Sequence, residues 1–422
     1  MNIWIFNHYA TDMYFDGAGR HQSFAKYLLR NGHDVKIFCA STVHNSDINV
    51  DTNNGIFVER LGKDNVSYVF VKTPEYKGNG FSRIKNMVEF YLRIFKVAKI
   101  YSKCEKPDII LASSVHPLTL VAGIQFGKKN KIPCICEVRD LWPETLVEMG
   151  IIDRNSLIAK ALYLGEKWIY KRADKLIFTM PGGKEYLKDM NMTHLVSLDK
   201  VYNINNGVDL ELYDVNKQTE IIDDTDLTNE SLFKIIYTGS VRSANHVDDL
   251  LEVAKILKEK GKNKIKIIVY GDGDQKEKLE NEAKQFELNN IVFKGRADKK
   301  YIPYILSQGN LNVVTGKDSE IGRYGISWNK LFEYMASGKP IIANYTIARY
   351  NFIDEYNIGI ANRFETLEKF AEVIIRIAEL PEAEYKDYGL RALKAASDFD
   401  YKNLTNKLEE ILIQTKKEYS KN

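Results

Sequence analysis

The sequence has few cysteines, little net charge and no apolar run long enough to cross a membrane. Four cysteines occur in 422 residues, Cys39, Cys104, Cys134 and Cys136, without the paired spacing of a metal site, which favours free thiols in a reducing cytoplasm. The 60 basic and 57 acidic residues nearly cancel, so overall charge gives no reason to expect a nucleic-acid partner. The first residues, MNIWIFNHYA, do not join a basic region to a sustained apolar stretch. We therefore expect a cytoplasmic protein without a signal peptide or a transmembrane helix.

Short apolar runs alternate with amphipathic stretches in both halves of the chain. In the first half, strands are predicted over Ile3–Phe6, Val35–Cys39, Ile109–Ala112 and Ile132–Val138, and a helix over Ser23–Asn31. In the second half, strands are predicted over Lys234–Tyr237, Lys266–Tyr270, Ile291–Phe293, Leu311–Val314 and Ile341–Ala343, and helices over Asp248–Lys260, Lys276–Phe286, Tyr301–Ser307 and Asn329–Ala336. A chain of 422 residues is too long to fold around one ordinary hydrophobic core. The alternation of strands and helices therefore predicts an α/β fold with two doubly wound units. The polar stretch Asp214–Asn229 is predicted to be a linker.

The segment Gly325–Pro340, GISWNKLFEYMASGKP, predicts a helix start that suits a nucleotide diphosphate. Backbone N–H groups at a helix N-terminus attract phosphate, and Ser327 is placed to cap the first turn. Glu333, further along the helix, can accept hydrogen bonds from ribose hydroxyls. The alternative interpretation is a buried helix with an N-cap and one solvated carboxylate.

This segment resembles the donor-binding signature of glycosyltransferase family 4, in which two Glu residues separated by seven positions hold the sugar nucleotide. The matching residues are Leu331, Phe332, Glu333, Tyr334, Met335, Ala336, Gly338 and Pro340. The first Glu of the pattern falls on Gly325, so the sugar contact it makes in the family does not carry over. The backbone amides of Gly325 and Ile326 can still face a sugar hydroxyl or carboxyl group. Lys330 is also predicted to bind the donor.

The resemblance extends over almost the whole chain and implies the GT-B fold, two Rossmann-like doubly wound domains facing a cleft. Residues 1–207 would form the acceptor-side domain and residues 208–399 the nucleotide-sugar domain, with a final helix over 400–417 packing back on the first. The implied activity is retaining transfer of a hexose or N-acetylated amino sugar from a UDP-linked donor. The implied acceptor is a lipid-linked or oligosaccharide intermediate of a surface polysaccharide such as O-antigen or capsule. In the family the leaving phosphate helps to take the acceptor proton, and neither a metal nor another cofactor takes part.

Two motifs of the first half follow predicted strands. Asp16–His21, DGAGRH, places Gly17 and Gly19 before a helix, where the backbone can approach a phosphate closely. It resembles the family's glycine-rich donor loop, and a plain tight turn is the alternative. His116 follows PDIILASSV, and its setting resembles that of a family histidine beside the transferred sugar. A helix-capping or solvated histidine is the alternative.

A third motif, EVRDLWP over Glu137–Pro143, gathers charge at the end of another buried strand. Such charges must pair or bind something. A structural pair between Arg139 and Asp140 is the first expectation. The string is also typical of a family subgroup that includes amino-sugar transferases, where it borders the acceptor, so Glu137, Arg139 and Asp140 are predicted on the acceptor side.

The second half contributes candidate cations. The strand end Tyr237–Ser240 brings Gly239 to the donor, and Arg242 follows where a fixed cation would meet the diphosphate. Arg323 is the second candidate cation, and an exposed surface arginine is the alternative for each. Gly271–Asp274, GDGD, is predicted to form a turn with Asp274 as a helix cap, not a metal site.

Residues 76–103 combine seven basic residues and one acidic residue with many apolar ones. This composition favours either an interfacial contact with anionic lipid on the inner face of the cell membrane or a core helix with a solvated basic face. Two other functions remain open for the whole chain. A sugar-nucleotide 2-epimerase shares the fold but needs carboxylates for acid and base work, and the Gly325 substitution allows an inactive binding protein.

Overall fold

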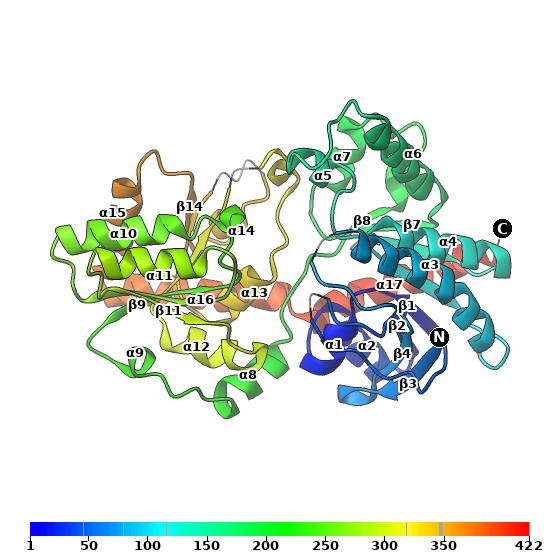
Figure 1. The fold of residues 1–422 in the computed structure, drawn as a ribbon, viewed down its shortest axis with the longest axis horizontal. Helices are drawn as coiled ribbons and strands as arrows, with labels where there is room; N and C mark the ends of the chain where they lie inside the picture. The colour runs from blue at the N-terminus through cyan, green and yellow to red at the C-terminus, as the bar shows by residue number, and fades with distance from the viewer. Residues whose placement is uncertain (45, 79, 115, 318, 346–348, 422) are drawn as a thin grey trace. The chain divides into compact units, whose positions relative to one another are not determined.

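The computed structural model describes residues 1–422 except 45, 79, 115, 318, 346–348 and 422. The chain divides into two compact units, each built on one parallel sheet (Figure 1). Unit 1 comprises Met1–Asn205 and Tyr401–Asn422, and unit 2 comprises Asn206–Asp400. Among the described residues, none of the helices has the length and apolar content that a bilayer crossing requires.

Unit 1 holds an eight-stranded sheet in the order β3-β4-β2-β1-β5-β6-β7-β8. Its strands are β1 (Asn2–Phe6), β2 (Asp34–Ala40), β3 (Phe57–Leu61), β4 (Ser67–Val71), β5 (Ile109–Ser113), β6 (Cys134–Val138), β7 (Lys175–Phe178) and β8 (Val201–Asn203). Its helices are α1 (Thr11–Asp16), α2 (Arg20–Arg30), α3 (Phe81–Tyr101), α4 (Pro117–Asn130), α5 (Glu144–Glu148), α6 (Leu157–Arg172), α7 (Gly183–Asp189) and α17 (Tyr401–Tyr419). β3 pairs antiparallel with β4, and the other neighbouring strands pair in parallel.

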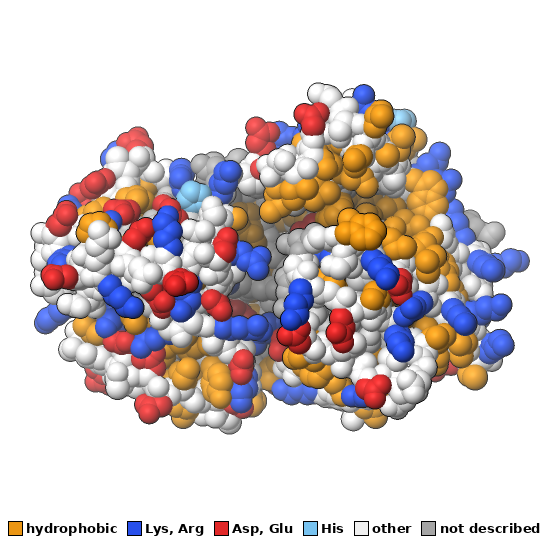
Figure 2. Space-filling model, in the orientation of Figure 1, with side chains coloured by type: hydrophobic (Ala, Val, Ile, Leu, Met, Phe, Trp, Pro, Cys, Tyr) orange, Lys and Arg blue, Asp and Glu red, His pale blue; other side chains and the backbone are white. Residues whose placement is uncertain are grey.

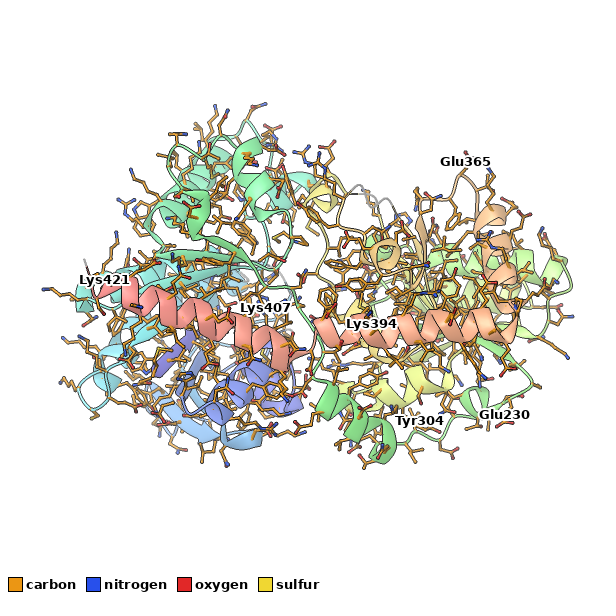
Figure 3. All side chains as sticks on the ribbon, turned by 180° about the vertical axis from the view of Figure 1, so that it is seen from behind. Glu230, Tyr304, Glu365, Lys394, Lys407 and Lys421 are labelled. Carbon is orange, nitrogen blue, oxygen red and sulfur yellow. The ribbon has the colours of Figure 1, made fainter. Side chains whose placement is uncertain are left out.

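The central strands of unit 1, such as β1 and β5, are apolar on both faces because helices cover both sides of the sheet. On β1, Ile3 and Ile5 belong to the core beneath α2 and α17. Trp4 points the other way, and its ring lies 6.3 Å from that of Tyr101 on α3 and 6.0 Å from that of Phe126 on α4. Figure 3 shows α17 running along unit 1, with Lys407 of the helix and Lys421 just beyond its end labelled. Its apolar residues join the core beside α2, which ties the end of the chain to the first sheet.

Unit 2 holds a six-stranded parallel sheet in the order β11-β10-β9-β12-β13-β14. Its strands are β9 (Phe233–Thr238), β10 (Ile265–Tyr270), β11 (Ile291–Gly295), β12 (Leu311–Thr315), β13 (Ile341–Asn344) and β14 (Gly359–Asn362). Its helices are α8 (Leu210–Thr219), α9 (Thr225–Thr228), α10 (Asp248–Glu259), α11 (Lys276–Gln285), α12 (Ile302–Gln308), α13 (Asn329–Ala336), α14 (Phe352–Glu355), α15 (Leu367–Ala378) and α16 (Glu382–Asp398). Two buried clusters, one on each side of the sheet, hold it between its helices. Lys394 on α16 is labelled in Figure 3.

The predicted linker Asp214–Asn229 is wrong, because this stretch is folded into unit 2. It contains most of α8 and all of α9, and Leu227 is fully buried. Its polar residues have partners: Asp224 caps α9 and lies 2.8 Å from the Lys294 ammonium. The composition that suggested a flexible segment therefore reflects capping and ion pairing.

Candidate active site

In unit 2, the strand β9 and the helix α13 are joined by a hydrogen bond at the carboxyl end of the sheet. The amide of Thr238, the last residue of β9, donates to the Tyr334 hydroxyl of α13 at 2.8 Å. One residue on, Gly239 has a φ of +143°. A side chain there would bring its Cβ within 3.0 Å of the Lys330 ammonium. Glycine at this position therefore lets the ammonium lie against the backbone of the turn.

Lys330 is the cation that the fold brings to this turn. Its ammonium donates to the Tyr237 hydroxyl at 3.3 Å and lies 4.5 Å from the centroid of the Tyr237 ring. The Trp328 ring centroid is 5.9 Å from the same ammonium. Burial lowers the pKa of Lys330 to about 8, although Glu333 partly opposes this shift. The group is charged at neutral pH and only partly solvated, which suits binding of an anion.

Glu333 lies on α13 one turn after Lys330 and is half-buried. Burial raises its pKa to about 7, with Lys299 and Lys330 opposing the shift. The alternative of a freely solvated carboxylate is therefore wrong. A carboxylate that has lost part of its hydration gains most from a hydroxyl donor.

The predicted capping role of Ser327 is wrong. Trp328 is the N-cap residue of α13 and makes no side-chain cap. The Ser327 hydroxyl instead accepts from the Asn206 amide at 2.7 Å, and the Asn206 side chain donates to the Ser327 carbonyl at 2.6 Å. These bonds fix the chain that enters α13.

Gly325 precedes this entry with a φ of +91° and a ψ of 164°. This backbone conformation is nearly exclusive to glycine. A glutamate at this position would therefore be strained in the backbone conformation that Gly325 adopts. Ile326, which follows, is half-buried.

The two arginines predicted as diphosphate ligands lie outside the Lys330 contact. Arg242 is exposed, just before the short 3-10 helix Ser243–Asn245. Arg323 is exposed on the 3-10 helix Glu320–Tyr324, and its guanidinium donates to the Tyr324 hydroxyl at 2.7 Å. Of the three basic residues predicted at the donor site, Lys330 is the one that the structure places against Gly239.

The Gly271–Asp274 segment forms the predicted turn, but Asp274 is not a cap, because Gln275 precedes α11 without a side-chain cap. This turn instead bonds to the loop that follows Gly239: the Val241 amide donates to the Asp272 carbonyl at 2.9 Å, and the Gln275 amide donates to the Val241 carbonyl at 3.1 Å. Its role is to hold the loop that follows Gly239.

Among the described residues, one group could offer three ligands to a metal ion: His246, Asp248 and Asp249. The Asp249 carboxylate already accepts from the Asn344 side chain at 2.8 Å. An acidic cluster of this kind does not by itself indicate a metal, and no function is assigned to it.

In unit 1, Glu137 is a fully buried structural carboxylate. At the end of β6 it accepts from Arg20 Nε at 2.8 Å, from His21 Nε2 at 2.9 Å and from the Ser113 hydroxyl at 2.7 Å. Burial opposes its ionisation, but Arg20 and His21 outweigh that effect and hold its pKa well below the usual value. The prediction of an acceptor contact is wrong for this side chain, because its oxygens are committed to α2 and β5.

Among the described residues, Arg139 and Asp140 form no ion-pair contact, although burial raises the pKa of Asp140 and Arg139 partly opposes that shift. Arg139 is half-buried, and its amide donates to the Ser114 hydroxyl at 3.1 Å, whereas Asp140 is exposed. Gly17 ends α1 and Gly19 precedes α2, so the glycine loop leads into the helix that Glu137 holds.

His116 is completely buried at the N-cap position of α4, and its side chain makes no cap. Its Nε2 lies 2.6 Å from Nδ1 of His8, which follows β1 and stacks on Phe90 of α3. Burial and the nearby Arg83 lower the pKa of His116 to about 3. Burial and His116 likewise hold the pKa of His8 well below its usual value. Both imidazoles are therefore neutral, and the N–H of one donates to the bare nitrogen of the other. Among the residues that the structure describes, His116 Nδ1 and His8 Nε2 are buried without a hydrogen-bond partner.

His8 was missed in the sequence analysis. Its signal was its place two residues after β1, because β1 and β5 are neighbours in the sheet. Neighbouring parallel strands bring the residues after their carboxyl ends together, here His8 and His116.

Both halves of the chain match known family models. Residues 15–212 match Glycosyltransferase Family 4, and residues 218–394 match Glycosyl transferases group 1. The chain belongs to glycosyltransferase family 4. In this glycosyltransferase, the Glycosyltransferase Family 4 match contains His116, the partner of His8. The Glycosyl transferases group 1 match contains Lys330 and Glu333.

Two curated relatives are glycosyltransferases by description. The chain is 23% identical over 276 residues to WbjE of Pseudomonas aeruginosa, described as a glycosyltransferase, which covers 64% of this chain and 66% of that protein. It is 24% identical over 214 residues to TuaH of Bacillus subtilis (strain 168), described as a teichuronic acid biosynthesis glycosyltransferase, covering 49% of each. The matches thus span just under two thirds and about half of the relatives' lengths.

The solved structures that resemble this glycosyltransferase share its fold. Sucrose-phosphate synthase from Thermosynechococcus elongatus has a TM-score of 0.71 at 16% identity, over 98% of both chains. Anabaena HepE in complex with UDP and glucose has a TM-score of 0.66 at 14% identity, over 98% of this chain and 99% of that one. The fold is GT-B, with two α/β units on parallel sheets.

Proposed function

We propose that this glycosyltransferase transfers a sugar from a UDP-linked donor to an acceptor in surface polysaccharide synthesis. The observation that carries the proposal is the Lys330 ammonium against Gly239, with the Glu333 carboxylate one turn further along α13. An ammonium fits a diphosphate, and a carboxylate fits the two hydroxyls of a ribose. The HepE complexes with UDP and glucose and the description of TuaH support this choice.

In the proposed donor site, Lys330 and the N-terminus of α13 neutralise the diphosphate, and Arg242 and Arg323 add positive charge. Glu333 binds the ribose. In unit 2, the remaining donor contacts are made by backbone groups at Gly239, Gly325, Ile326 and Ser327. Because protein groups supply the positive charge, the proposed reaction needs no metal or other cofactor.

In the proposed reaction, the bond between the sugar C1 and the phosphate oxygen breaks, and a bond from C1 to the acceptor hydroxyl oxygen forms. The hydroxyl proton passes to the leaving phosphate, and the anomeric configuration is retained. His116 holds a hydroxyl of the transferred sugar. With a pKa of about 3 it stays neutral, so it can hydrogen-bond but does not act as an imidazolium.

The proposed acceptor is a lipid-linked or oligosaccharide intermediate of O-antigen or capsule type, with Arg139 and Asp140 beside it. The protein would work on the cytoplasmic face of the membrane, held there through residues 76–103. Within this stretch α3 buries Asn86, Phe90, Ile94 and Val97 and leaves several apolar residues exposed. The helix thus combines a core face with an apolar outer face.

The test is an assay of UDP release and product formation from UDP-glucose and UDP-N-acetylglucosamine, with lipid extract or oligosaccharide as acceptor. Lys330→Met is the control variant, in which donor binding should be weakened. Transfer that persists in excess EDTA supports the assignment, whereas loss restored by manganese contradicts the metal-free chemistry. NMR of the donor incubated alone would reveal an epimer if the protein is a 2-epimerase. UDP binding without turnover on any acceptor would indicate an inactive binding protein.

A further inference from the structure

Helix α3 of unit 1 carries a stripe of exposed apolar residues: Phe81, Ile84, Val88 and Leu92. Their spacing of three and four residues puts them on one side of the helix, opposite the buried Asn86 and Phe90. Phe81 is 81% exposed. Apolar residues gathered on one exposed face indicate a contact surface.

A second group of exposed apolar residues occurs where α5 turns into α6. Met149, Ile151, Leu157, Ile158 and Leu164 each expose more than half of their surface, and Leu157 exposes 83%. Leu157 and Leu164 are seven residues apart on α6 and so share one side of the helix. Figure 2 shows hydrophobic side chains gathered over the part of unit 1 that carries α5 and α6. From the sequence alone, these apolar residues would be expected in the core, but the structure places them on the surface.

Both groups belong to the same helical layer and lie toward the same edge of the sheet. α3 and α4 pack against the ring of Trp4, and Tyr170 of α6 lies 5.7 Å from Phe178 of β7. α3 connects the parallel strands β4 and β5, and α6 connects β6 and β7. A helix between parallel strands runs back along them, so both helices begin near the carboxyl ends of the strands. His8 and His116 follow strands that end at this edge.

Basic residues surround both groups. Residues 149–172 contain five Lys and Arg against Asp153 and Glu166, and Glu166 is buried. Residues 76–103 contain seven Lys and Arg against Glu89. Basic side chains around exposed apolar ones match an anionic lipid surface, where lysine meets head groups and the apolar residues enter the interface.

We propose that the α5–α6 segment and the outer face of α3 form one two-point docking surface for an anionic lipid bilayer. The inference rests on the proposed transfer to a lipid-linked acceptor and adds an insertion element, the residues Met149, Ile151, Leu157 and Ile158. Docking through the layer that begins at the carboxyl edge brings His116 and Arg139 close to lipid head groups. A second copy of the chain fits this surface less well, because a two-fold contact would set its basic residues against themselves.

The test is sedimentation of the full chain with vesicles of phosphatidylcholine, with and without phosphatidylglycerol. The test variant changes Met149, Ile151, Leu157 and Ile158 to Ser. The matched control changes Ile221 and Leu390 of unit 2 to Ser, since both are equally exposed apolar residues. UDP affinity and size are measured on the same samples.

Wild-type protein should sediment with the anionic vesicles, and the test variant should bind them at least about tenfold more weakly. The control variant should behave as wild type, and UDP affinity should be the same in all three. Wild-type protein that ignores anionic vesicles, or a test variant that binds as wild type, overturns the inference. A wild-type dimer that becomes a monomer in the test variant assigns the surface to a second copy instead. If the wild-type protein does not bind UDP, the proposed function is refuted, independently of the result of the vesicle sedimentation.

Discussion

Replacing Lys330 by Met should weaken UDP binding more than any other single change of a cation in unit 2. The ammonium lies 3.3 Å from the Tyr237 hydroxyl and is flanked by the Tyr237 and Trp328 rings, so it is positioned before ligand arrives. A hydrogen bond to a charged group contributes about 1.5–3 kcal/mol. Its loss should therefore lower UDP affinity by about 10- to 150-fold at pH 7, measured by calorimetry.

The pH dependence supplies a second test of Lys330. Its free pKa is about 8, and a diphosphate that stabilises the ammonium by the amount above raises the pKa in the complex by about one to two units. The contribution of Lys330 to binding is then fully present below its free pKa and is lost as the pH rises from about 8 to about 10. The Lys330→Met variant should lack this alkaline loss.

Lys339→Met is the matched control, because Lys339 is also half-buried and lies beyond the other end of α13. It should bind UDP as wild type does. Arg242→Gln should cost less than Lys330→Met, since Arg242 is exposed. If Lys330→Met binds UDP normally, or keeps the alkaline loss, Lys330 does not contact the diphosphate.

Three further changes probe the other assignments. Glu333→Gln should weaken UDP binding by about 10-fold or more, because charge-assisted hydrogen bonds to the ribose are lost. The UDP affinity of the wild-type protein should also fall as the pH drops below about 7, where Glu333 becomes protonated. Calorimetry at several pH values checks both expectations. His116→Ala should lower the turnover number more than UDP affinity, and equal losses would indicate a structural histidine. Glu137→Gln should destabilise unit 1 by about 3–5 kcal/mol in urea unfolding, because Arg20 loses its buried partner. This stability is present above the unfolded pKa of Glu137 and is lost as the pH falls toward the lowered folded value, so the variant should show less acid sensitivity than wild type.

The regular elements were largely predictable from the sequence, because their signal is local. Asn329–Ala336 was predicted with the bounds that α13 has, since its apolar residues recur at the period of a helix. Strands such as β9 and β12 differ from their predicted ranges by about one residue at either end. The Asp214–Asn229 stretch failed because polar composition shows neither caps nor ion-pair partners.

The partners of the buried polar groups could not be predicted, because they are distant in sequence. Glu137 lies 117 residues from Arg20, and His116 lies 108 residues from His8. Sequence spacing predicted that these residues follow strands, but the choice of partner depends on strand order in the sheet. The exposure of Leu157 was equally hidden, since an apolar residue on an amphipathic helix is expected to pack inward.

Two carboxylates show how burial and partners separate structure from function in this chain. Glu137 is fully buried and saturated by donors from Arg20, His21 and Ser113, and its low pKa means that it is ionised and stable without a ligand. Glu333 has lost part of its hydration, and the nearby cations only partly offset the effect, so its pKa rises to about 7. A group in that condition is stabilised by any hydroxyl donor that reaches it. Of the two glutamates predicted at the site, Glu333 is therefore the one whose environment is completed by a ligand.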